Sequence, residues 1–512
     1  MGPLYLLCTQ YALFSINKCK GGRSIFELQL PTGIWMGIIF PFFLVINMIL
    51  LIPLFFWEKA DPRGTLLWMA VMIFVPPVGF GLYVIIGPTY YFRFRGFKMK
   101  AELDELISST HESNMAVIEK RVRKGVTDEE EARFIKTLGN AGAKSYSDNN
   151  DVKLYIDGQE KFRSLIQDIE NAESSIHLEY YIVRNDRIGN KIMDAIEVKA
   201  AEGLKVRILF DAFGSGRDMW KRMRSLRKSG VNVTFFHKLS RLFLNPKKNN
   251  RNHRKIAIID DKICYLGGFN IGDDYISSED KGYWRDTSVR ITGEAVNWVQ
   301  LRFITDWRYA FGEDLLSSLS YSNEVSEAGN TGVQIISGGP DVLRENPIEM
   351  QYLMMFSAAK ETLYLHTPFL APTSGMIDGL RMAALSGVDV RLIIPDRANQ
   401  PLVYWSNMHY ASVLMKSNVK VYLYRNGFMH SKAIVADSKF CSVGSANLDE
   451  RSMNLNFETN AMIYSEELGQ TMTKEFLRDL ERCEEFSEDN YKTMSLRSKF
   501  KVGLARLATS LL

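Results

Sequence analysis

The sequence predicts an α/β protein of two similar halves, preceded by a membrane-spanning helical hairpin. Three observations carry this prediction. Two long segments near the N-terminus contain no charged residue, strand-like and helix-like patterns alternate from about residue 151, and one uncommon motif occurs twice in that later region. Alternating strands and helices are typical of α/β folds. A motif that repeats together with its surroundings indicates an internal duplication.

Length and composition limit the number of domains and the class of protein. The 512 residues are enough for two or three domains with full cores. The net charge of +4 is mild and argues against a nucleic-acid-binding protein. We divide the chain into an N-terminal segment (1–30), a two-span hairpin (31–92), a charged helical connector (93–150), two α/β halves (151–325 and 326–490) and a basic amphipathic tail (491–512).

The hairpin prediction rests on residues 28–57 and 64–92, which carry no charged side chain. Each run exceeds the roughly 20 residues that cross a bilayer as a helix. A helical hairpin buried in a soluble core is the alternative, but uncharged runs of this length are rare in soluble domains. Basic residues lie before the first run and after the second, while the loop at 58–64 is neutral. The positive-inside rule therefore predicts a multi-pass cell-membrane protein with its two α/β halves on the cytoplasmic side.

Two α/β units of similar order follow from about residue 151. Each unit starts with an apolar strand, at 176–183 or 363–370, and a helix follows. A second strand then begins near Gly203 or Gly387, and the repeated motif comes after it. Because each unit has the same order of elements, we expect two halves of the same topology.

The repeated motif has the form His-x-Lys-x4-Asp. Its two copies are His253, Lys255 and Asp260, and His430, Lys432 and Asp437. Both copies run into short apolar segments typical of buried strands. Side chains alternate along a strand, so each histidine shares a face with its lysine. Each aspartate lies at an odd offset from its histidine, at the far end of the strand. This position favours anchoring a turn or orienting the site over contact with substrate.

This residue combination suits a phosphate group. An imidazole supplies a nucleophile or a proton, and the neighbouring ammonium supplies fixed positive charge. Two such units that face each other would provide one histidine to attack phosphorus and one to protonate the leaving alcohol. Turns containing Gly268 and Asn270, and Ser445 and Asn447, follow the two motifs and are candidate phosphoryl-binding elements. Neither the carboxylates nor the Cys and His residues have metal-ligand spacing, so we expect no metal or other cofactor.

These residues resemble the phospholipase D superfamily, whose signature is a pair of His-x-Lys-x4-Asp motifs. The resemblance extends over nearly the whole chain to the bacterial cardiolipin synthases of that superfamily. Its further matching stretches are residues 175–181, 209–215, 251–255, 283–287, 401–405 and 444–452. The resemblance implies two phospholipase D-like halves related by pseudo-twofold symmetry, with one active site between them.

The resemblance also implies a function. We expect a phosphatidyltransferase that makes cardiolipin and glycerol from two phosphatidylglycerol molecules, with His253 as nucleophile and His430 as acid and base. The sequence leaves the reverse assignment open. A hydrolase that releases phosphatidic acid is the nearest alternative. A nuclease is disfavoured by the hairpin and the near-neutral charge, and a lipid-binding protein with inactive motifs is disfavoured because both motifs are intact.

Three features of the sequence each allow two interpretations. The basic cluster at 241–255 is either a solvated loop or a contact for anionic membrane lipids. The tail has basic residues and Leu or Phe at helical spacing, which fits either a membrane-surface helix or packing on the protein's own core. The polar residues His177, Glu179 and His366 on the first strand of each unit either line the site or are satisfied core groups.

Overall fold

The computed structural model describes residues 62–75, 128–236, 250–276, 282–315, 328–340, 346–397 and 400–508, with Gly79 and a few positions between 41 and 49. It separates residues 1–95 from residues 96–512. In the first unit, helix α3 (Pro62–Phe74) begins at a proline, a residue preorganised for a first helical turn. In the described part of the chain, no helix has the length and apolar character of a membrane span. Most of the predicted hairpin lies outside the described residues.

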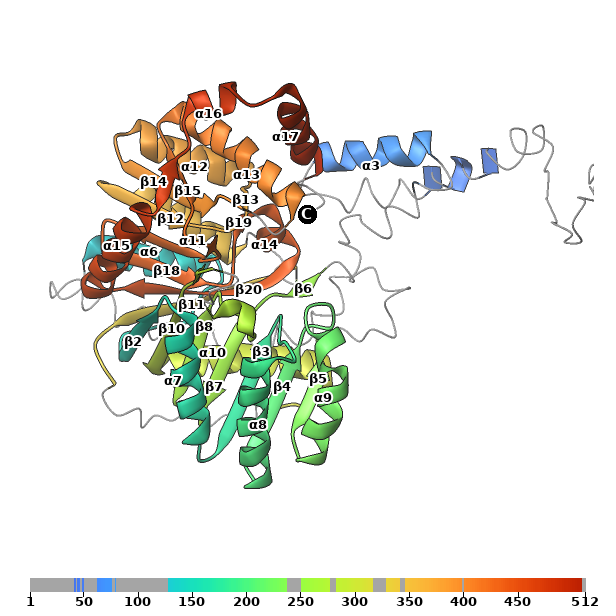
Figure 1. The fold of residues 1–512 in the computed structure, drawn as a ribbon, viewed down its shortest axis with the longest axis vertical. Helices are drawn as coiled ribbons and strands as arrows, with labels where there is room; N and C mark the ends of the chain where they lie inside the picture. Colours follow the sequence, from blue (N-terminus) through green and yellow to red (C-terminus); the bar gives the residue numbers. More distant parts are fainter. Residues whose placement is uncertain are drawn as a thin grey trace, which may run out of the picture. The chain divides into compact units, whose positions relative to one another are not determined.

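The first half contains a seven-stranded mixed sheet. Its strand order is β2 (Asn150–Tyr155), β10 (Ser288–Gly293), β8 (Ile263–Gly267), β7 (Lys255–Ile259), β3 (Ser175–Tyr180), β4 (Lys205–Phe210) and β5 (Asn232–Phe235). Strands β3, β4 and β5 are parallel, and the remaining pairs are antiparallel. Helices α7 (Gly158–Glu170), α8 (Arg187–Ala201) and α9 (Gly216–Lys228) lie together on one side of this sheet (Figure 1).

The second half repeats this order. Its sheet runs β11 (Gly332–Gly338), β20 (Asn456–Tyr464), β18 (Phe440–Gly444), β17 (Ala433–Ala436), β12 (Thr362–His366), β14 (Asp389–Pro395) and β15 (Lys420–Tyr424). Strand β1 (Tyr146–Ser147) extends one edge and β21 (Cys483–Glu485) the other. Helices α11 (Pro347–Ala358), α12 (Ser374–Leu385), α13 (Pro401–Leu414) and α15 (Glu466–Leu480) complete this half. The matching strand order confirms the predicted duplication.

The two halves share a core and exchange short strands. One apolar cluster contains buried residues of both sheets, among them Ile256 and Val289 of the first half and Ala433 and Val443 of the second. Strand β6 (Arg251–Asn252) precedes the first motif and pairs with β20 of the second half. Strand β16 (Phe428–Met429) precedes the second motif and pairs with β9 (Trp284–Arg285) of the first half. Each motif is therefore attached to the opposite half.

Part of the segment predicted as a connector belongs to the second half. Helix α6 (Glu129–Asn140) buries Phe134, Ile135 and Leu138 in that half's core, and β1 pairs with β11. Residues 93–150 were predicted to form a charged amphipathic helical connector, because apolar residues recur at helical intervals among many charged ones. The structure corrects this from residue 129 onward, because the apolar face of α6 is buried against the sheet.

The tail forms helices α16 (Glu488–Lys492) and α17 (Leu496–Ala508). Helix α17 packs against α13 and buries Val502 and Ala505. Its opposite side leaves Leu496 and Phe500 86% and 73% exposed. Of the two alternatives for the tail, packing on the protein itself accounts for one face of α17 only.

Candidate active site

The two motif histidines are placed by backbone hydrogen bonds that cross between the halves. The amide of His253 donates to the carbonyl of Phe457 on β20, at 3.0 Å. The amide of His430 donates to the carbonyl of Arg285 on β9, at 2.7 Å. Both histidine residues are more than nine-tenths buried. The equivalent bonds give the two histidines equivalent positions in the duplicated fold.

Each histidine is held by a carboxylate from the other half. His253 Nδ1 lies 2.8 Å from Oε1 of Glu458, which is fully buried on β20. His430 Nδ1 lies 2.6 Å from Oδ2 of Asp286, which is fully buried after β9. A carboxylate on Nδ1 fixes the tautomer of an imidazole, so in both residues Nε2 carries the free lone pair.

The two carboxylates are themselves held, at corresponding turns after the motifs. Glu458 accepts hydrogen bonds from the hydroxyl of Ser445, at 2.5 Å, and from the side-chain amide of Asn456, at 3.1 Å. Asp286 accepts from the amide of Thr287 at 2.8 Å. A Cβ on Gly268 would come within 2.0 Å of Asp286 Oδ1, so this position requires glycine. Gly268 and Ser445 thus support the carboxylates that hold the histidines.

The electrostatics of both pairs are alike. Burial, opposed in part by the neighbouring carboxylate, lowers the pKa of His253 to about 4, and the same holds for His430. Burial alone would raise the pKa of Glu458 and of Asp286, but the adjacent histidine and lysine outweigh it and lower both. At neutral pH each pair is therefore a neutral imidazole on a charged carboxylate, which leaves Nε2 nucleophilic.

The two lysines add positive charge beside the histidines. Lys255 Nζ donates to the carbonyl of His253, and Lys432 Nζ to the carbonyl of His430, both at 2.5 Å. Burial lowers the pKa of Lys255 to about 7 and that of Lys432 to about 8. An anionic phosphodiester placed between them would favour the charged form of both.

The aspartates of the motifs lie at the far ends of the strands. Asp260 accepts hydrogen bonds from the amides of residues 173–175, and Asp437 from the amides of residues 360–362. Both adopt a left-handed backbone conformation, with φ of 55° and 50°. These contacts anchor turns, as the strand offset led us to expect, and they give neither aspartate a contact with the histidines.

The two predicted asparagines differ. Asn270 uses its side chain internally, accepting from the amide of Ile182 at 3.2 Å and donating to Tyr275 at 3.0 Å. The Oδ1 atoms of Asn447 and of Asn456 are buried, and neither has a hydrogen-bond partner among the described residues. A ligand with hydroxyl groups can satisfy both oxygens.

The sequence left two interpretations open for the polar strand residues His177, Glu179 and His366. In the structure, His177 and Glu179 are buried core groups. His177 stacks on Phe303 at 4.7 Å, with Nδ1 3.0 Å from the side chain of Gln300. Glu179 accepts from the side-chain amide of Asn252 at 2.5 Å, and burial raises its pKa well above the usual range.

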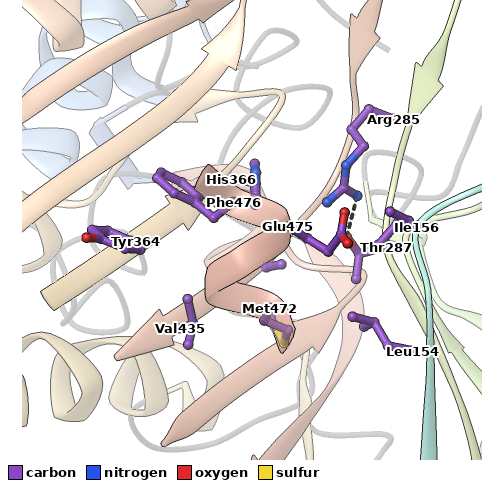
Figure 2. Close-up of a pocket in the computed structure, with 11 residues that line it drawn as sticks. Leu154, Ile156, Arg285, Thr287, Tyr364, His366, Val435, Met472, Glu475 and Phe476 are labelled. Atoms are coloured by element: carbon purple, nitrogen blue, oxygen red, sulfur yellow. Dashed lines mark hydrogen bonds between the residues drawn. The ribbon is translucent and has the colours of Figure 1, made fainter. Parts of the chain in front are cut away.

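His366 lines a small pocket between the halves, together with Arg285 and Thr287 (Figure 2). Neither motif histidine lines this pocket. Arg285 bonds to Asp479 at 2.7 Å, to the carbonyl of Asp286 at 2.6 Å and to the hydroxyl of Thr287 at 3.1 Å. Arg285 therefore stabilises the segment that contains Asp286, the carboxylate partner of His430.

Sequence reasoning missed the residues that complete the site. It used the stretch around Asp286 only as part of a resemblance, and it did not single out Glu458. Arg254 was also missed: it is fully buried and joins Asp306 of its own half, at 2.7 Å, to Thr459 of the other, at 2.9 Å. The available signal for Glu458 was a charged residue shortly before the apolar run at 461–463, since buried charges need partners.

Two histidine–lysine pairs on a duplicated α/β fold, each histidine held by a carboxylate from the opposite half, place the chain in the phospholipase D class of proteins. The family described as "Cardiolipin synthase, PLD-like domain" matches residues 165–307 and 352–480, and a phospholipase D-nuclease N-terminal domain matches residues 45–88. The chain belongs to the bacterial cardiolipin synthases of the phospholipase D superfamily, and it is an enzyme of that family.

Individual relatives agree with this assignment. Cardiolipin synthase of Staphylococcus aureus is 38% identical over 478 residues, which cover 91% of this chain and 95% of the relative. Cardiolipin synthase of Oceanobacillus iheyensis is 37% identical over 487 residues, covering 94% and 99%. The crystal structure of phosphatidylserine synthase from Haemophilus influenzae superposes with a TM-score of 0.56 at 16% identity, covering 74% of this chain and all of that one. This last likeness shows the fold alone.

Proposed function

We propose that the enzyme transfers the phosphatidyl group of one phosphatidylglycerol to a headgroup hydroxyl of a second, which yields cardiolipin and glycerol. One observation carries the proposal: two neutral imidazoles, each held by a buried carboxylate and flanked by a lysine, in a chain that matches cardiolipin synthases over most of its length. Such a pair can act in turn as nucleophile and as acid and base.

In the first step, Nε2 of His253 attacks phosphorus. A P–N bond forms, the P–O bond to the glycerol headgroup breaks, and His430 gives its proton to the departing oxygen. His430 is neutral in the empty site, so it gains this proton when the anionic phosphodiester binds, and Asp286 stabilises the resulting imidazolium. Lys255 and Lys432 stabilise the charge that builds on the phosphoryl oxygens.

In the second step, the headgroup hydroxyl of another phosphatidylglycerol attacks the phosphohistidine. A P–O bond forms, the P–N bond breaks, and the hydroxyl proton passes to His430. Asn447 and the turn at Gly268 are placed to bind the substrate or support the site. The two-step reaction requires no cofactor, because lysines and a histidinium supply the positive charge.

A product assay tests the proposal. Purified full-length protein is incubated with phosphatidylglycerol and a chelator, and the lipids are identified by mass spectrometry. We expect cardiolipin and free glycerol, with both lost in His253→Ala. Phosphatidic acid without cardiolipin would instead identify a hydrolase, the nearest alternative activity. Acid-free trapping of the phosphoenzyme, followed by peptide mapping, tests whether the phosphate is carried by His253 or His430.

We also propose that residues 31–92 form a two-span hairpin in the cell membrane with the catalytic halves in the cytoplasm. The uncharged segments, the basic residues at their outer ends and the N-terminal domain match at residues 45–88 support this arrangement. A cysteine introduced in the 58–64 loop is expected to react with an impermeant reagent from outside the cell. Labelling from the cytoplasmic side alone would overturn the topology.

A further inference from the structure

The duplicated fold is unequal at the residues that precede the two histidines. Arg251 and Phe428 occupy equivalent positions, each two residues before its histidine, on the short strands β6 and β16. Arg251 pairs in register with Asn456, whereas Phe428 pairs with Trp284. The His253 side of the site thus carries a cation at a position where the His430 side carries an aromatic ring.

A second pair of equivalent positions has opposite charges. Arg451 follows Asn447 at the same spacing as Asp274 follows Asn270. Arg451 lies on the short helix α14 (Glu450–Asn454), which packs on β20 immediately before Asn456, the partner of Arg251 (Figure 1). The two arginines therefore come from opposite halves and meet on the same side of the site. We call Arg251, Arg451 and Tyr181 the His253 rim.

Tyr181 connects this rim to the reaction centre. Its ring meets the imidazole of His253 edge to face at 4.9 Å, and Lys255 Nζ lies 5.5 Å from the ring centroid. Burial raises the pKa of Tyr181, and the charges of Arg251 and Arg451 oppose this rise. The Arg251 guanidinium lies over the ring of Phe213, 4.5 Å from its centroid. All three rim side chains are partly exposed, so a ligand can reach them.

Two acidic side chains near the rim, those of Asp211 and Asp449, accept hydrogen bonds from backbone amides. Asp211 accepts from the amides of Phe213, Gly214 and Asn252. Asp449 caps α14 by accepting from the amide of Ser452 at 2.6 Å. Burial raises the pKa of both carboxyl groups.

We propose that Arg251 and Arg451 bind the phosphodiester of the acceptor lipid. This inference rests on the proposed transfer between two phosphatidylglycerol molecules. The lysines and histidines hold the phosphoryl group under attack, yet the acceptor carries a second phosphodiester three carbons away from its reacting hydroxyl. A paired guanidinium site next to the histidines matches that second anion. Phe428 and Asp274, at the equivalent positions on the His430 side, do not match a second anion.

Two reactions of the same phosphoenzyme separate this role from general catalysis. In the first, labelled free glycerol attacks the phosphohistidine: the P–N bond breaks, a P–O bond forms, and label enters phosphatidylglycerol. In the second, phosphatidylglycerol attacks and cardiolipin forms. Glycerol has no phosphate, so only the second reaction uses the proposed subsite. Both are measured in the same mixed micelles of phosphatidylglycerol and detergent, with the full-length protein.

We expect Arg251→Gln and Arg451→Gln each to lower cardiolipin formation roughly tenfold or more, as loss of a charged hydrogen bond does, and to change glycerol exchange by less than about twofold. Retained exchange also demonstrates that the variants fold. Arg222→Gln is the matched control, because this arginine of α9 pairs with Asp194 and Glu197 on α8 and is expected to leave both reactions unchanged.

The remaining outcomes overturn the inference. Equal loss of both reactions in the Arg251 and Arg451 variants would mean that these arginines recruit the enzyme to anionic micelles or support the fold, and not that they select the acceptor. Unchanged cardiolipin formation would mean that they bind no substrate. Failure of the proposed function is distinguishable, because the wild-type enzyme would then incorporate labelled glycerol or release phosphatidic acid without making cardiolipin.

Discussion

Glu458 of the second half lies 2.8 Å from Nδ1 of His253 in the first half. These residues are separated by 205 positions in the chain. The reciprocal pair, Asp286 and His430, spans the same interface in the other direction. Neither half therefore contains a complete histidine–carboxylate pair, and the packing of the halves determines the tautomer of both histidines.

Replacement of Glu458 by Gln tests this relationship. We expect kcat to fall on the order of a hundredfold or more, because a neutral amide neither fixes the tautomer nor stabilises an imidazolium. KM for phosphatidylglycerol is expected to change little. Glu467→Gln on the exposed side of α15 serves as the control. Wild-type turnover in Glu458→Gln would show that the carboxylate is structural only.

Gly268→Ala is expected to abolish most activity. The added Cβ would lie 2.0 Å from Oδ1 of Asp286 and would displace the carboxylate that holds His430. Gly503→Ala is the matched control, since no atom lies within 4 Å of a Cβ at that position. Turnover and thermal unfolding are measured for both variants. Comparable activity in the two would contradict the close packing on Asp286.

The lysines predict a decline in activity at alkaline pH. The pKa of Lys255 is lowered to about 7 and that of Lys432 to about 8, so both lose their charge as pH rises through this range. We expect kcat/KM, which reports the free enzyme, to fall above about pH 7–8. Lys255→Arg is expected to move this limb upward, since a guanidinium stays charged. A profile that stays flat to pH 10 would refute the role of the lysines.

The exposed face of α17 predicts membrane binding. Leu496, Phe500 and Leu504 share one side of the helix and are exposed, and basic residues lie between them. Replacing these three by Ser leaves Val502 and Ala505 packed and is expected to weaken binding of the protein's catalytic region to phosphatidylglycerol vesicles. Removal of residues 495–512 should do the same. Unchanged vesicle sedimentation in the triple variant would assign the tail to packing alone.

Local patterns in the sequence were sufficient to predict the elements of the fold and the histidines and lysines of the site. Alternating apolar residues identified the central strands, although the strands that the sequence placed at 176–183 and 363–370 end earlier, at Tyr180 and His366. Strand periodicity also placed each motif aspartate away from its histidine. These features depend on neighbouring residues, so a short stretch of sequence contains them.

The sequence indicated an amphipathic helix in the connector, but it did not show which part of the protein the apolar face of α6 packs against. The pairing of α6 with the second half depends on which sheet edge is available, and a local pattern does not specify that.

By itself, the sequence determined the duplicated motif, the family and the chemistry of histidine beside lysine. Only the tertiary structure decided which carboxylate holds which histidine, and that Arg251 and Arg451 meet on one side of the site while Phe428 and Asp274 occupy the equivalent positions of the other. The physical reason is that hydrogen bonds and charges act through space. Their partners are set by the packing of two sheets, whose residues lie far apart in the chain.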